Sequence, residues 1–84
     1  IDLSARFTGP VVSQLQHIFA DDWFFETGER LPEDDDLYPP HDQTGPVAAQ
    51  VVPTGPNHEA ETFRRVLVAA LNAAREQIII TTPY

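Results

Sequence analysis

Hydrophobic and polar residues alternate over the first eight positions of the chain. Leu3, Ala5 and Phe7 lie on one side of an extended segment, and polar residues occupy the other side. A period of two residues is typical of a strand with one face in solvent, so we predict a strand at residues 2–8. Gly9-Pro10 then changes the pattern, because proline is suited to the first turn of a helix.

A helical period begins at residue 11. Seven apolar side chains share one broad face of a helical wheel: Val11, Val12, Leu15, Ile18, Phe19, Trp23 and Phe25. Gly28 is the expected end of this helix, because glycine readily adopts the left-handed conformation that follows many helices. Phe24 falls on the opposite side of the wheel, which indicates either fraying of the last turn or a second contact surface.

The second half of the chain predicts a strand, a helix and a strand. Residues 47–52 read as a strand, Asn57 is a suitable cap for a helix that ends at Gln77, and residues 78–82 read as the last strand. The apolar face of this helix is Phe63, Val66, Leu67, Ala70, Leu71 and Ala74. We therefore predict an α/β fold of order β-α-linker-β-α-β, whose second half is a right-handed βαβ unit with parallel strands.

Three consecutive isoleucines, Ile78–Ile80, indicate a strand that is covered on both faces, as in the interior of a parallel or mixed sheet. The chain reaches Tyr84 without supplying that cover, and Ile1-Asp2-Leu3 is not a translation start. We therefore expect these 84 residues to be an excerpt of a longer protein. The uncovered segment 78–82 is also a candidate for self-association between copies, because exposed strands invite edge pairing.

The net charge of −8 is concentrated in one window, residues 21–42, which holds nine acids and one base. The acids are Asp21, Asp22, Glu26, Glu29, Glu33, Asp34, Asp35, Asp36 and Asp42. Prolines and this charge predict an irregular linker at residues 29–46. Lysine is absent, and no cluster of cations is present to replace the counterions of a phosphate backbone, so we expect no nucleic-acid partner.

Few residues of the sequence are candidates for catalysis or metal binding. Asp22 falls in the middle of the first apolar face, where a carboxylate must be paired. It is either a catalytic acid or, as we favour, a buried structural carboxylate. His17, His41 and His58 lie far apart in the sequence, and the acidic run lacks the spacing and the glycine of a calcium loop. The chain also has no cysteine. We expect no catalytic residue, no metal site and no cofactor within it.

Four motifs follow one another along the chain. They are Arg6-Phe7-x-Gly9-Pro10-x-Val12-x-x-Leu15-x-x-x-Phe19-x-x-Asp22-Trp23, then Gln50-Val51-Val52-x-x-Gly55-Pro56, then Leu71-Asn72-Ala73-Ala74-Arg75, and finally Ile78-Ile79-Ile80-Thr81-Thr82-Pro83-Tyr84. In this order they resemble the middle of bacterial cardiolipin synthases of the phospholipase D superfamily. The resemblance covers nearly the whole chain apart from residues 29–46.

The resemblance implies a two-lobe enzyme with one His-x-Lys-x(4)-Asp motif in each lobe. One histidine forms a phosphohistidine, and the other acts as general acid and base. A phosphatidyl group then passes between two phosphatidylglycerol molecules and glycerol is released. The chain contains no lysine and so holds neither motif. We therefore expect the parent to be a phosphatidyltransferase at the cell membrane, and this excerpt to be soluble and inactive.

The resemblance also implies three segments. Residues 1–28 would close the first lobe, residues 29–46 would join the lobes, and residues 47–84 would open the second lobe. Thr82 and Tyr84 would then lie at the edge of the substrate cleft, whereas Asp22 would remain structural. Two other interpretations stay open. One is an acidic module that binds a protein or a cation through its acidic loop, and the other is a phospholipase D homologue that has lost catalysis.

Overall fold

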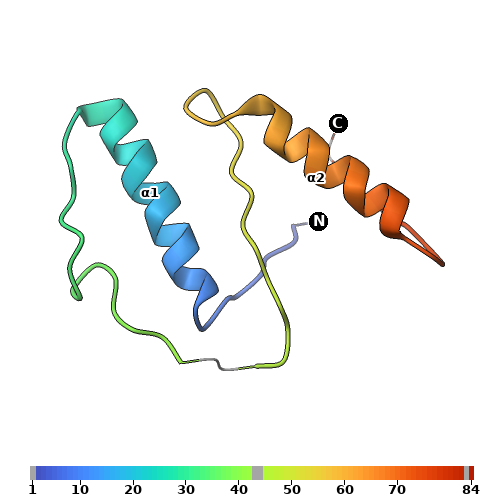
Figure 1. The fold of residues 1–84 in the computed structure, drawn as a ribbon, viewed down its shortest axis with the longest axis horizontal. Coiled ribbons are helices and arrows are strands. Elements are labelled where there is room, and N and C mark those ends of the chain that lie inside the picture. Colours follow the sequence, from blue (N-terminus) through green and yellow to red (C-terminus); the bar gives the residue numbers. More distant parts are fainter. Residues whose placement is uncertain (1, 43–44, 83) are drawn as a thin grey trace. The chain divides into compact units, whose positions relative to one another are not determined.

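A computed structural model describes residues 2–42, 45–82 and 84, and it divides the chain into two compact units, Ile1–Val51 and Val52–Tyr84. The first unit contains helix α1 (Val11–Thr27) and the second contains helix α2 (Ala60–Ala73) (Figure 1). Both predicted helices are therefore present.

Helix α1 has Pro10 as its N-cap, directly after Gly9, and it ends at Gly28. Gly9 is buried and has a φ of 90°, and its carbonyl accepts a hydrogen bond from the N–H of Val12 at 3.1 Å. At the other end Gly28 has a φ of 73°, and its N–H donates to the Phe24 carbonyl at 2.8 Å. This left-handed cap satisfies a carbonyl of the last turn. The predicted end of the helix at Gly28 is confirmed.

The acidic segment that follows α1 contains a tight turn. The Tyr38 N–H donates to the Asp34 carbonyl at 2.8 Å, and the N–H groups of Asp36 and Leu37 both donate to Asp34 Oδ1 at 3.2 Å. Aspartate favours such turns because its side chain can replace a backbone acceptor. Further along, the Val51 N–H donates to Gln14 Oε1 at 2.9 Å, which brings the end of the first unit to α1.

Helix α2 is shorter at both ends than predicted. Its N-cap is Glu59, not Asn57, because residues 55–58 form a turn in which the His58 N–H donates to the Gly55 carbonyl at 3.1 Å. The helix ends at Ala73, and Ala74 is already extended with a ψ of 136°, so the predicted continuation to Gln77 is wrong. On the helix surface, the Arg64 guanidinium lies 3.6 Å from the Glu61 carboxylate and forms an exposed ion pair.

The predicted α/β fold is wrong for the residues that the structure describes. Residues 2–8, 47–52 and 78–82 form no strand, and consequently there is no parallel βαβ unit. A strand exists only when its backbone groups pair with those of a neighbouring strand. Among the described residues, the backbone hydrogen bonds outside the regular helical pattern join positions three or four apart, as in turns and caps. The alternation at residues 2–8 therefore has no ladder to hold it extended in a sheet.

The apolar faces of both helices remain accessible to solvent. Within the described ranges, no hydrophobic or polar side chain is buried. Phe19 on α1 is 53% exposed, and Leu67 on α2 is 40% exposed. Each helix is consequently held mainly by its own backbone hydrogen bonds.

Replacing Gly28 by alanine should weaken the end of α1. An L-residue held in the left-handed region costs about 1 kcal/mol or more, whereas glycine adopts it freely. A β-carbon at this position would meet no atom within 4 Å, so the expected loss reflects backbone strain alone. The measurement is helix content by far-UV circular dichroism during thermal unfolding.

Gly45→Ala is the matched control for this prediction. A β-carbon at Gly45 also meets nothing within 4 Å, and the residue lies outside both helices. Gly45→Ala should therefore leave helix content unchanged. The loss of helix content in Gly28→Asn should lie between the losses in the two alanine variants, because asparagine tolerates the left-handed conformation. Equal effects of the two alanine variants would contradict the assignment of Gly28 as the cap.

Candidate functional site

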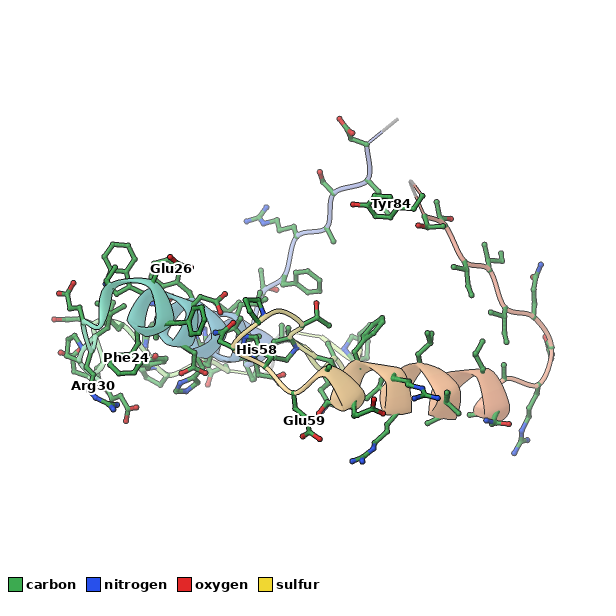
Figure 2. All side chains as sticks on the ribbon, turned by 90° about the horizontal axis from the view of Figure 1, so that it is seen from above. Phe24, Glu26, Arg30, His58, Glu59 and Tyr84 are labelled. Carbon is green, nitrogen blue, oxygen red and sulfur yellow. The ribbon has the colours of Figure 1, made fainter. Side chains whose placement is uncertain are left out.

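Thr82 and Tyr84 are the residues predicted to lie at a substrate cleft, and both are exposed. The Tyr84 N–H donates to Thr82 Oγ1 at 3.3 Å, so the two residues are joined through the threonine hydroxyl. Figure 2 shows the Tyr84 ring at the end of the described chain. Pro83, the middle residue of this motif, lies outside the described residues. The pair offers two hydroxyl groups for hydrogen bonding and no general base.

Asp22 lies on α1 and is exposed, whereas the helical wheel predicted a buried carboxylate. The difference has a simple cause. None of the described apolar side chains of α1 is buried, so the face on which Asp22 lies keeps its contact with water. Its predicted structural role in a longer protein stays a prediction.

The three histidines occupy separate places. His17 lies on α1, His41 is half-exposed in the acidic segment, and His58 precedes α2. Among the described residues, no group of three or more histidine and carboxylate side chains is arranged to hold a metal ion.

The segment after α1 is fastened to the helix by two side-chain contacts near Gly28. The Trp23 indole Nε1–H donates to Glu29 Oε2 at 3.0 Å, and the Arg30 guanidinium lies 4.4 Å from the centre of the Phe24 ring (Figure 2). The second contact is a cation–π interaction. It gives Phe24 a partner on the side of α1 away from the apolar face. Of the two predicted interpretations of Phe24, a second contact surface agrees with this geometry.

A third contact lies further along the same segment. The imidazole of His17 stacks on the ring of Tyr38, with 4.3 Å between ring centres and 24° between ring planes. Figure 1 shows the chain running back beside α1 after the helix ends. We call Glu29, Arg30 and Tyr38 the α1 clasp. The clasp was not predicted, because prolines and charge favour an irregular linker here. The one signal in the sequence was Tyr38, an aromatic residue within an acidic segment.

A hollow of about 670 Å³ lies in the first unit, at the start of α1. Its lining is Arg6, Phe7, Thr8, Pro10, Val11, Gln14, Gly45, Pro46, Val47, Ala48 and Ala49. Arg6, Phe7 and Pro10 belong to the first motif that carries the family resemblance. Among the described lining residues Arg6 supplies the only charge, so the hollow can attract an anion but contains no acid–base pair for catalysis.

Comparison with known proteins identifies the class of protein that the chain resembles. The whole chain is similar to part of bacterial cardiolipin synthases, which confirms the resemblance found in the motifs. Two such relatives are cardiolipin synthase A of Yersinia pseudotuberculosis serotype O:1b (strain IP 31758) and cardiolipin synthase A of Yersinia pestis bv. Antiqua (strain Angola). Each is 42% identical to this chain over 87 residues.

The similarity extends over all of this chain but over only a small part of each relative. It covers 100% of this chain and 18% of each relative, so the chain spans about a fifth of the length of the curated relatives it matches. No family model and no solved structure matches the chain. The relatives' names therefore describe proteins much longer than this chain.

Removing the Glu29 carboxylate should release Trp23, the single tryptophan of the chain. In Glu29→Ala the indole N–H loses its acceptor and gains water, so tryptophan fluorescence should shift to longer wavelength. The loss of stability should stay below about 1 kcal/mol, because the bond is exposed to solvent.

Glu26→Ala is the control for this prediction, because Glu26 is also an exposed acid near the end of α1 (Figure 2). It changes the net charge by the same amount but leaves the Trp23–Glu29 bond intact. Its fluorescence should match that of the original chain. An equal spectral shift in both variants would show that charge, rather than the clasp, controls the tryptophan environment.

Proposed function

We propose that the chain is a central, non-catalytic segment of a cardiolipin-synthase-like phosphatidyltransferase. The observation that carries the proposal is the 42% identity that extends over the entire chain while covering 18% of the relatives. The absence of lysine supports the non-catalytic part, since each expected catalytic motif requires one. The chain then contributes structure to the enzyme, and the catalytic motifs belong to its other segments.

The proposed reaction transfers a phosphatidyl group in two steps. A histidine outside this chain attacks the phosphorus of one phosphatidylglycerol, the bond from phosphorus to the glycerol oxygen breaks, and glycerol leaves with a proton from the second histidine. A hydroxyl of another phosphatidylglycerol then gives a proton to that histidine and attacks the phosphohistidine. Cardiolipin forms and the first histidine is regenerated. Lysines beside the phosphate stabilise its negative charge.

Within this enzyme we assign residues 1–28 to the end of the first lobe, residues 29–46 to the connection between lobes, and residues 47–84 to the beginning of the second lobe. The boundary between the two compact units falls between Val51 and Val52, inside the last of these segments. The clasp contacts keep part of the connection against α1. The connection therefore begins as an ordered extension of the first segment.

Thr82 and Tyr84 are the residues that we place at the edge of the substrate cleft. Their hydroxyl groups can donate hydrogen bonds to a phosphate or to a glycerol headgroup, and both are accessible. The substrate is a membrane lipid, so the proposed enzyme works at the cell membrane. In the part of the chain that the structure describes, no helix is long and apolar enough to cross a membrane.

A chimeric enzyme tests the proposal. The matching 87 residues of Yersinia pseudotuberculosis cardiolipin synthase A are replaced by the 84 residues of this chain. If the chain is the equivalent segment, cardiolipin formation and glycerol release from phosphatidylglycerol should remain within about tenfold of the parent rate, a barrier change of about 1.4 kcal/mol. The chain alone should show no release of glycerol.

Two further proteins make this test specific. A segment of the same composition in scrambled order should abolish the activity of the chimera, since it cannot form α1 or its clasp. In the active chimera, Thr82→Ala and Tyr84→Phe should raise KM for phosphatidylglycerol, whereas Thr54→Ala, outside the proposed cleft, should not. An inactive but folded chimera would contradict the proposal, as would turnover by the isolated chain.

A further inference from the structure

A hydrogen bond between distant parts of the sequence holds Val51 to α1. The Val51 N–H donates to Gln14 Oε1 at 2.9 Å, although the two residues lie 37 positions apart. By contrast, the backbone–backbone bonds of the described turns and caps join positions three or four apart. Val51 is half-buried, whereas residues 45–50 before it are exposed. The chain therefore becomes partly covered at the point where Gln14 holds it.

The segment that follows α1 contacts the helix in reverse order. In order along the segment, the contacting pairs are Trp23–Glu29, Phe24–Arg30, His17–Tyr38 and Gln14–Val51. Residues 45–49 also line the hollow at the start of α1 together with Gln14. The segment consequently runs back along α1 and reaches the beginning of the helix at Val51.

The length of the chain does not fix the position of Val51. Between Tyr38 and Val51 the chain can extend about 45 Å when it is fully stretched. Their partners, His17 and Gln14, lie only about 4.5 Å apart along the axis of α1. Because the chain is much longer than this interval, contacts rather than length determine where it ends. Gln14 supplies such a contact through its side-chain amide, whose oxygen accepts a backbone N–H as a peptide carbonyl does.

We propose that Gln14 is a positioning residue that fixes the point at which the chain enters the second lobe. The inference rests on the proposed function, in which residues 47–84 begin that lobe. Val51 is the last residue of the first compact unit. Because Gln14 holds Val51, the second lobe starts from a defined point on α1, and the connection at residues 29–46 can vary in length without moving that point. Catalysis by two histidines depends on their alignment about one phosphate, to which this starting point contributes.

Hydrogen exchange of the Val51 amide, followed by NMR on the 84-residue chain, tests the contact itself. Gln14→Met keeps the length of the side chain but removes the acceptor, so exchange should become about fivefold faster, as expected for the loss of one hydrogen bond. Gln14→Glu keeps an acceptor oxygen and should retain the slow exchange. Gln16→Met is the matched control, because residues two positions apart face different sides of a helix. Its Val51 amide should exchange as in the original chain.

The chimeric cardiolipin synthase tests the positioning role. A Gly-Ser-Gly-Ser insertion between Pro40 and His41 lengthens the connection, and it should change kcat less than about twofold while Gln14 is present. In Gln14→Met the same insertion should lower kcat about fivefold, because the contact and the original length are then both lost. Gln14→Glu should restore tolerance of the insertion, and Gln16→Met should retain it. A residue that only stabilised the fold would lower activity equally at either length of the connection.

Two results would overturn the proposal. One is a Val51 exchange rate that Gln14→Met leaves unchanged, or that Gln14→Met and Gln16→Met raise equally. The other is an active chimera in which the insertion has the same effect with and without Gln14, since the proposed function would then stand and the positioning role would not. An inactive but folded chimera would remove the proposed function and the positioning role with it, while the exchange rates would still show whether Gln14 holds Val51.

Discussion

Backbone hydrogen bonding is the constraint on which the rest of this structure depends. A helix satisfies its N–H and C=O groups within one segment, apart from those at its two ends. A strand needs a second segment alongside it. In this chain α1 and α2 form because their bonds and caps are local, such as the bond from the Gly28 N–H to the Phe24 carbonyl. Among the described residues, the segments with strand-like sequence form no ladder and remain irregular.

The same constraint explains why the helices carry apolar faces without a core. Phe19 on α1 and Leu67 on α2 occupy positions that packing would favour, yet both remain exposed. An amphipathic helix gains most of its stability in a protein from the surface that covers this face. The chain matches 18% of each relative, so in the proposed enzyme other segments cover these faces.

Helices could be predicted from this sequence because their signals are local. The period of apolar residues located α1, and Gly28 located its end, since a left-handed cap needs only one suitable residue. Strands could not be predicted correctly, because alternation at residues 2–8 describes which side chains would share a face but not whether a neighbour exists. The N-cap of α2 was misplaced for a related reason. Asn57 lies in the turn at residues 55–58, and that turn delays the helix to Ala60.

In the candidate site, too, local sequence motifs could be predicted and contacts between segments could not. Motif order indicated the cardiolipin synthases, and the comparison confirmed that resemblance. The clasp was missed because it joins Glu29, Arg30 and Tyr38 to α1 through side-chain contacts, which no periodicity encodes. The exposure of Asp22 was also missed, since a helical wheel identifies a face but not what covers it.

The central claim is that this chain is an inner segment of a two-motif phosphatidyltransferase. The most direct measurement is the sequence of the genomic DNA on both sides of the region that encodes Ile1 to Tyr84. The claim predicts an open reading frame that continues in both directions and encodes His-x-Lys-x(4)-Asp before Ile1 and again after Tyr84. A frame that continues without either motif would contradict it.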